Sequence, residues 1–222
     1  MIDLILETKD LCKSFKRPGG TQTVLDKLNL QIYKGKMTAI RGKSGNGKST
    51  LLNILAATMM ADSGEVFYRD IDLQKLSNAE RARYRRERVG YIPQNLYLLE
   101  DRNVFMNIAL PLQHSCEKKE RIRKKVEEVA EWFDIKFLLG KAPQTLSRGE
   151  RQRVAICRSI VRIPEILFAD EPTGSLDEEN ERLVLEMFEN LKRQGTTIIL
   201  ATHDDTVSQI CDEVYHIGHS GK

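Results

Sequence analysis

Residues Gly42–Thr50, GKSGNGKST, decide how this chain folds. They fit the pattern G-x-x-x-x-G-K-[ST], in which a glycine-rich backbone surrounds the phosphates of a nucleotide. An apolar run at 37–40 precedes them and another at 51–57 follows, which predicts the order strand, loop, helix. A helix start adds unpaired N–H donors and a partial positive charge. We therefore predict a phosphate-binding loop. The alternative is a glycine-rich turn that binds nothing, which the flanking strand and helix disfavour.

The composition indicates a folded, globular chain. Of 222 residues, 41% are hydrophobic and 30% charged, which fits one α/β domain over 1–222. The net charge of +3, from 35 Lys and Arg against 32 Asp and Glu, is too balanced to indicate a nucleic-acid partner. Four cysteines lack C-x-x-C spacing and are expected to be reduced thiols, not a disulfide frame or a zinc site. No apolar run is long enough to span a bilayer, so we expect any membrane part to belong to another chain.

The first hundred residues read mainly as strands joined by turns. A strand is predicted at 3–8, then a basic, flexible loop at 13–20, then a half-exposed antiparallel strand at 24–32. Phe15, near the glycine-rich stretch, could stack on an adenine ring or could be an ordinary packed aromatic residue. A helix is predicted at 78–88; its arginines form either a solvated face or a patch that touches a partner or anionic lipid.

The middle of the chain reads as helical, and we predict an inserted helical subdomain at about 95–160. Its first part, 95–111, is rich in apolar residues, some of which must be core and some of which could form a groove for another protein. A charged helix with one apolar side follows at 117–133. Ser147 and Glu150 fit the capping box S-x-x-E, which predicts a helix start.

Polar residues end the strands predicted in the last third of the chain. The run 166–169 is typical of a buried parallel strand and ends in Asp170 and Glu171. Carboxyl ends of parallel strands are where α/β sheets place ligand sites. A helix capped by Asp177 should stop at Gly195, and the next strand ends near His203.

Together these motifs resemble the nucleotide-binding domain of ATP-binding cassette (ABC) proteins, over almost the whole chain. Any one motif is moderately specific, but all of them in this order and spacing are very specific. In chain order, Gly42–Thr50 resemble the Walker A loop, Gln94 the Q-loop glutamine, Leu146–Glu150 the signature motif, Asp170 and Glu171 the Walker B aspartate and catalytic glutamate, Ser175–Asp177 the D-loop, and His203 the switch histidine.

The resemblance implies an α/β fold of the P-loop NTPase, ABC-ATPase type. Its RecA-like, mostly parallel sheet would carry an antiparallel β subdomain and the inserted helical subdomain. It also implies a second copy of the chain as an ATP-dependent dimer partner, an integral-membrane permease, and a cytoplasmic position at the membrane through that permease. The residues that would contact ATP are Phe15, Gly42, Lys43, Ser44, Gly45, Asn46, Gly47, Lys48, Ser49, Thr50, Ser147 and Gly149.

The same resemblance implies roles in ATP hydrolysis. Lys48 would hold the phosphates, Glu171 would polarise the attacking water, and His203 would reach the γ-phosphate. Mg²⁺ would be held by Ser49 and Gln94, with Asp170 orienting a metal-bound water. Arg148 departs from the family pattern, because most members have glycine there; it could change dimer affinity or the shape of the signature turn.

Within the family, the stretches 89–95, 107–112 and 169–177 resemble ATPases of the MacB/LolD/FtsE group and related peptide or bacteriocin exporters. Such ATPases work with separate permeases, and the stretch 95–112 would receive a permease helix. Two other classes are open. A chromosome-maintenance or DNA-repair ATPase would need a long coiled coil, and no sustained heptads occur. A P-loop kinase or GTPase would explain the phosphate loop but not Ser147, Glu171 and His203 together.

Overall fold

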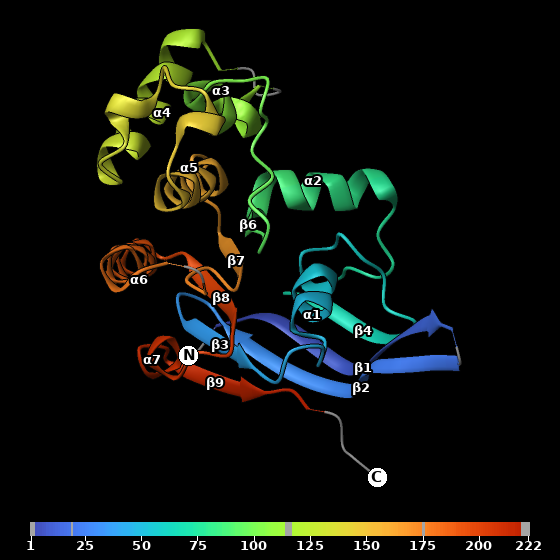
Figure 1. Ribbon diagram of the computed structural model, residues 1–222. Helices are drawn as coiled ribbons and strands as arrows, with labels where there is room; N and C mark the ends of the chain where they lie inside the picture. The colour runs from blue at the N-terminus through green and yellow to red at the C-terminus, as the bar shows by residue number, and fades with distance from the viewer. Residues whose placement is uncertain (1–2, 19, 114–116, 175, 219–222) are drawn as a thin grey trace.

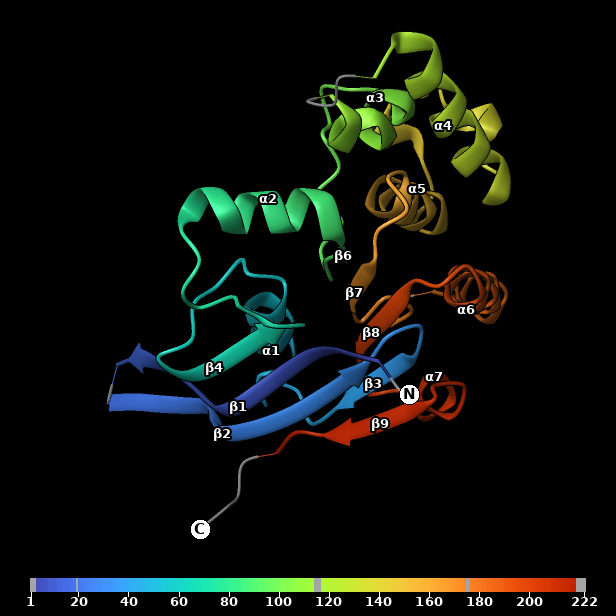
Figure 2. The same cartoon turned by 180° about the vertical axis from the view of Figure 1, so that it is seen from behind.

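The computed structural model describes residues 3–18, 20–113, 117–174 and 176–218. Figures 1 and 2 show two sheets with the helix α1 (Lys48–Leu55) between them, and a group of helices stacked beyond one end of the sheets. This arrangement of a mostly parallel sheet, an antiparallel sheet and a helical region agrees with the predicted fold class. No helix within the described ranges is both long enough and apolar enough to cross a membrane.

The first sheet is antiparallel, with the strand order β2-β1-β4-β5 in the described residues. The predicted half-exposed strand at 24–32 is confirmed as part of β2, whose residues alternate in exposure along much of their length. The strands are β1 (Leu4–Arg17), β2 (Gly20–Tyr33), β4 (Ser63–Tyr68) and β5 (Ile71–Asp72).

The prediction of a flexible loop at 13–20 is wrong. β1 continues to Arg17 and β2 begins at Gly20, and these two residues are paired at the end of a hairpin; residue 19 lies outside the described residues. A ladder satisfies backbone N–H and C=O groups whatever the side chains are, so a basic sequence is no obstacle to strand pairing. Phe15 therefore projects from a strand, opposite Gln22, and not from a loop.

The second sheet is parallel, with the order β6-β7-β8-β3-β9. Residues of β7 and β8 are buried along their whole length, as expected for parallel strands covered on both faces. The predicted strand at 166–169 and the predicted strand that ends near His203 are thus confirmed as β7 and β8. The strands are β3 (Met37–Arg41), β6 (Val89–Ile92), β7 (Ile166–Asp170), β8 (Thr197–Thr202) and β9 (Glu213–His216).

Helix α1 lies where the cores of the two sheets meet. It follows β3 through the phosphate loop, and its apolar side chains pack with antiparallel strands on one side and with parallel strands on the other. Such packing removes the apolar side chains of the helix from water. The fully buried side chains of α1 are Leu51, Leu52, Ile54 and Leu55.

The remaining helices cover the parallel sheet or form the helical region. Those outside it are α2 (Asn78–Arg88), α6 (Glu178–Arg193) and α7 (Asp205–Gln209). Those between β6 and β7 are α3 (Val104–Ala109), α4 (Lys119–Trp132), α5 (Arg148–Ile160) and the short 3₁₀ turns η1 (Leu110–Leu112), η2 (Lys136–Leu138) and η3 (Pro143–Thr145).

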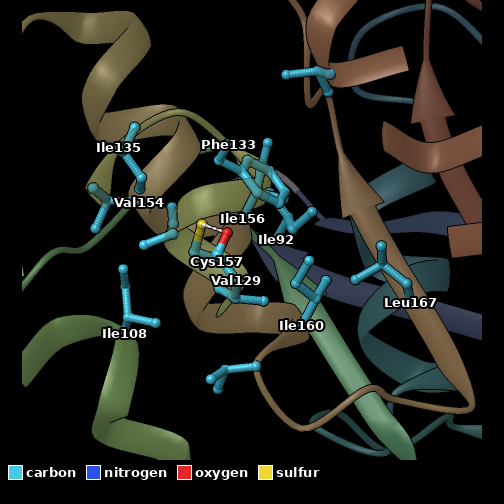
Figure 3. Packing of buried hydrophobic residues seen from close by; sticks show 14 of the residues in the cluster. Ile92, Ile108, Val129, Phe133, Ile135, Val154, Ile156, Cys157, Ile160 and Leu167 are labelled. Carbon is cyan, nitrogen blue, oxygen red and sulfur yellow. Dashed lines mark hydrogen bonds between the residues drawn. The ribbon is translucent and has the colours of Figure 1, made fainter. Parts of the chain in front are cut away.

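The helical region shares one core with the parallel sheet. Figure 3 shows Phe133 and Ile156 beside Ile92 of β6, with Val129 and Ile108 farther away, and all belong to one buried cluster. The predicted helix start at Ser147 is confirmed: its side chain accepts a hydrogen bond from the Glu150 N–H, and the Glu150 carboxylate accepts one from the Ser147 N–H. The start of α5 is therefore fixed in place by local bonds and by the packing behind it.

Candidate functional site

The phosphate loop takes its shape from two glycine positions. Gly47, which caps α1, has φ +89°, and a Cβ there would lie 2.4 Å from the Val24 Cγ1 atom. A Cβ on Gly42 would lie 2.4 Å from the Ile217 carbonyl oxygen. Only glycine fits such close approaches, and at Gly47 it is also the residue that adopts the left-handed conformation without strain. The loop is thus held between β2 on one side and the segment after β9 on the other.

Lys48 is the first residue of α1 and points back under the loop. Its side chain is only 8% exposed, and its Nζ donates to the Gly42 carbonyl oxygen at 2.9 Å. The same Nζ lies 3.4 Å from the Glu171 Oε1. The buried ammonium is therefore compensated by one carboxylate, as a buried charge requires.

Asp170 and Glu171 leave the carboxyl end of β7 in the middle of the parallel sheet. The Glu171 N–H donates to the Ala201 carbonyl oxygen at 2.9 Å, which extends the ladder with β8 by one bond. Glu171 has φ +48°, a conformation that a non-glycine residue rarely adopts and that is often found at functional sites. This turn moves the Glu171 side chain out of the strand direction and toward the loop.

His203 follows the neighbouring strand and meets Glu171. Its Nδ1 lies 2.9 Å from the Glu171 Oε2, and its side chain is 68% exposed. Arg41, at the end of β3, donates to the His203 carbonyl oxygen and is ion-paired with Asp205 at 2.5 Å. Glu171 therefore connects the lysine of the loop with the histidine at the surface.

The Asp170 carboxylate is suited to bind a cation. Burial raises the pKa of its carboxyl group, a hydrogen bond from Ser49 and the charge of Lys48 oppose that shift, and the charge of Glu171 adds to it. Its Oδ1 is buried and has no hydrogen-bond partner within the described part of the chain. A buried carboxylate oxygen without a partner, beside a second carboxylate and a hydroxyl, fits Mg²⁺, which prefers oxygen ligands.

Two cavities open on this cluster. The first, of about 250 Å³, brings together most of the predicted site residues, and Phe15 forms one wall of it. A cavity of that size suits a ligand held by a few polar groups. It is lined by Phe15, Arg17, Val24, Ser44, Gly45, Gly47, Lys48, Ser49, Thr50, Gln94, Asp170 and Glu171.

The second cavity, of about 460 Å³, also borders Lys48 and Glu171 and reaches the start of α5. Gln94, Lys48 and Ser44 line both cavities, as does Glu171. It is lined by Lys43, Ser44, Lys48, Gln94, Asn95, Arg148, Gln152, Glu171, Gly174 and His203.

Four predicted residues do not line either cavity. The Asn46 side chain donates to the Ile217 carbonyl oxygen, and Gly42 is covered by the same residue. Ser147 caps α5, and Gly149 packs against Asn180. Ser147 and Gly149 therefore lie in the signature motif but are not brought to the phosphate loop of their own chain. Ser175 of the predicted D-loop lies outside the described residues.

Several residues near the site were not predicted. Arg17 and Val24 line the first cavity, and Arg41 supports the His203 loop. The second cavity adds Asn95, Gln152 and Gly174. The only sequence signal for Arg17 was its place in a basic stretch beside Phe15. Val24 and Arg41 lie in strands, and nothing in their local sequence marks them, because their roles depend on contacts distant in the chain.

A glycine-rich loop between a strand and a helix, facing two carboxylates at the end of a parallel strand, defines a P-loop nucleoside triphosphate-binding protein. The family described as ABC transporter matches residues 25–174, which is more than half of the chain. The chain therefore belongs to the ABC transporter family and is an ATP-binding domain of that family.

Curated relatives support this membership over nearly the whole chain. The chain is 35% identical to the macrolide export ATP-binding/permease protein MacB of Pasteurella multocida over 95% of its own residues, and it spans 32% of that protein's length. It is also 35% identical to the ABC transporter ATP-binding protein YvrO of Bacillus subtilis, covering 96% of this chain and 93% of that one. The chain thus corresponds to one part of MacB and to almost all of YvrO.

Solved structures show the same architecture. The dimeric structure of MJ0796, a bacterial ABC transporter cassette, superposes with a TM-score of 0.91 at 29% identity, over 96% of this chain and 94% of that one. CbiO1 from Clostridium perfringens, part of the transporter complex CbiONQ, superposes with a TM-score of 0.85 at 29% identity, over 97% and 85%. The fold observed here is therefore that of an ABC cassette.

Proposed function

We propose that this chain hydrolyses ATP and drives a separate membrane permease. The observation that carries the proposal is the Glu171 carboxylate, held between Lys48 and His203 at the junction of two cavities beside the phosphate loop. Phosphoryl transfer to water depends on positioning and charge stabilisation more than on covalent chemistry. The residues brought together at the loop are of the types that this reaction needs.

In the proposed mechanism Lys48 and the loop amides bind the β- and γ-phosphates, and Phe15 stacks on the adenine. Glu171 accepts a proton from the attacking water, and His203 holds the carboxylate in place and reaches toward the γ-phosphate. Ser49, Gln94 and Asp170 are the residues that would hold Mg²⁺. When bound, Mg²⁺ neutralises charge on the phosphate oxygens.

We also propose that two copies of the chain dimerise around ATP, with Ser147 and Gly149 facing the nucleotide of the other copy. In one chain neither residue lines the cavities at the phosphate loop, while both lie at a capped helix start whose open N–H groups suit an anion. Because the complete site would exist only in the dimer, ATP bound there would favour dimer assembly by mass action.

Static light scattering on Glu171→Gln protein tests this assembly. With Mg²⁺ and ATP we expect the mass of a dimer, because the variant binds ATP but does not hydrolyse it. Without nucleotide we expect the mass of a monomer. Glu171→Gln combined with Lys48→Ala is the matched control, and we expect it to stay monomeric with ATP. A monomer for Glu171→Gln at saturating ATP would contradict the dimer.

The permease is expected to dock in a groove of about 450 Å³ between α2 and the helical region. The groove combines an apolar floor, which includes Leu110 and Pro111, with four arginines. Leu110 and Pro111 belong to the stretch predicted to receive a permease helix. The arginines are Arg85, Arg86, Arg158 and Arg162.

Three of these arginines are bonded to backbone carbonyls, not to acids. Arg85 donates to the Ala57 carbonyl at 2.6 Å, Arg162 to the Pro111 carbonyl at 2.9 Å, and Arg158 to the carbonyls of the segment after β6. These three have no ion pair with a carboxylate among the described residues, whereas Arg86 lies 3.9 Å from the Glu87 carboxylate. Burial also lowers the pKa of Arg158. The groove therefore favours an amphipathic segment that carries acidic side chains.

Charge reversal at the groove tests this docking. A tagged chain is recovered from detergent-solubilised membranes, and the permease bound to it is quantified. We expect Arg86→Glu to lower that amount by about tenfold, because like charges facing each other oppose association. Arg83→Glu, on the same helix and outside the groove, is the matched control and should retain the permease. Equal recovery with both variants would place the permease elsewhere.

A further inference from the structure

The backbone turn that carries Glu171 is bonded to α5 by a buried side chain. The Gln152 side chain is 6% exposed, and its Nε2 donates to the Pro172 carbonyl oxygen at 2.8 Å. Pro172 is also buried and directly follows Glu171 in the chain. Because a buried carbonyl oxygen without a partner is costly, the bond from Gln152 fixes where this turn can lie.

The turn needs such support because the backbone of Glu171 is strained. A non-glycine residue at φ +48° keeps that conformation only where the surrounding structure holds it. On the side before the turn, the Glu171 N–H donates to the Ala201 carbonyl oxygen at 2.9 Å. On the side after it, the Gly174 N–H donates to the Glu171 carbonyl oxygen at a longer distance of 3.4 Å. The bond from Gln152 is therefore the shorter of these two constraints on the chain that follows Glu171.

Helix α5 is a rigid base for this contact. Val154 and Ile156, which follow Gln152 in the helix, are 0% exposed and belong to the core shared with the parallel sheet. A residue whose neighbours are locked by packing holds a site more precisely than a loop residue does. Gln152 also lines the second cavity together with Glu171 and Gly174. Its bond therefore joins the turn after β7 to an element that does not shift easily.

We propose that Gln152 is a positioning residue for ATP hydrolysis, which holds the Pro172 carbonyl and thereby places the Glu171 carboxylate. The inference rests on the proposed ATP-hydrolysing function of the same site. Gln152 acts through the backbone and takes no proton itself. A general base works only within hydrogen-bond reach of the water that it activates, so the position of the turn controls the rate of the chemical step.

Steady-state ATP turnover by Gln152→Met protein tests this role. Methionine is unbranched and adaptable but has no N–H donor, so the Pro172 carbonyl loses its partner. We expect kcat to fall by about tenfold, since a misplacement of about 1 Å can cost about 10²-fold in rate. The KM for ATP should change less than about twofold, because the lost bond is made to the protein and not to the nucleotide. Gln152→Asn, whose amide is one methylene too short to reach Pro172, should behave in the same way.

A double-mutant cycle separates positioning from a general structural effect. In Glu171→Gln protein, Gln152→Met should change the residual turnover less than about twofold, because no carboxylate is left to misplace. Gln144→Met is the matched control and should keep the normal kcat. Gln144 also donates to a backbone carbonyl, that of Glu100, at 2.8 Å, but it lines neither cavity. Thermal unfolding of each variant shows whether it is folded.

Three results would overturn the role of Gln152. They are an unchanged kcat in both Gln152 variants, a loss of equal size with and without the Glu171 carboxylate, and a loss matched by Gln144→Met. If the unsubstituted protein did not turn over ATP at all, the proposed function itself would fail, which is a different result.

Discussion

Purified Glu171→Gln protein is expected to bind ATP but to hydrolyse it on the order of 10²-fold or more slowly than the unsubstituted chain, the scale of a lost general base. The amide keeps the size of the carboxylate but cannot accept a proton from water at neutral pH. It can still accept a hydrogen bond, so the contact with the His203 Nδ1 is kept in part. The loop and Lys48 remain, which is why binding survives when turnover is lost.

Steady-state phosphate release and equilibrium ATP binding, measured on the same preparation, check this prediction. Glu186→Gln is the matched control, because Glu186 lies on the exposed face of α6 and, among the described residues, is paired only with Arg182. We expect it to turn over ATP at the rate of the unsubstituted protein. Turnover within a few fold of normal in Glu171→Gln protein would remove Glu171 from the role of base.

Phe188→Ala should destabilise the fold by about 3–5 kcal/mol in free energy of unfolding, the usual range for a buried Phe reduced to Ala. The Phe188 side chain is 0% exposed and belongs to the cluster that joins the parallel sheet, α6 and the helical region. Removing the phenyl ring leaves a cavity, and the surrounding side chains cannot close it because they belong to separate elements that would have to move together. For a domain whose total stability is about 5–15 kcal/mol, such a loss brings the chain close to unfolding.

Urea denaturation followed by circular dichroism measures this effect. Phe137→Ala is the control, since it makes the same change at η2 in the helical region, where the side chain is 65% exposed. We expect it to cost less than about 1 kcal/mol, the scale of surface substitutions. Equal losses for the two variants would mean that Phe188 does not join the elements in the way described.

Elements whose sequence signal is local were predicted well. The loop at Gly42–Thr50, the buried strand ending at Asp170 and the capping box at Ser147 each depend on residues adjacent in the chain. The hairpin at 13–20 was missed because strand pairing there depends on hydrogen bonds to another segment, and its charged side chains carry no period-two pattern. The sequence therefore predicted individual helices and strands more reliably than it predicted which strands pair with each other.

The same distinction holds at the candidate site. Lys48, Asp170, Glu171 and His203 could be chosen from motifs, but the motifs contain no information on their separation. That the Glu171 carboxylate is shared between Lys48 and His203 follows from the adjacency of β3, β8 and β7, which are far apart in sequence. Arg148 could be recognised as unusual from the motif, but that it lines a cavity together with Lys43 could not.

The burial of α1 between two sheets has a consequence for the newly made protein. Eight residues are too few to hold a helix in water, and the apolar residues of this one, Leu51, Leu52, Ile54 and Leu55, are fully buried in the folded chain. Part of its enclosure comes from β7 and β8, which are synthesised more than a hundred residues after it. The phosphate loop therefore cannot take its final shape during early translation, and nascent or truncated chains that lack those strands should neither capture nor consume ATP. Competence to bind the nucleotide thus reports that synthesis and folding of the cassette are complete.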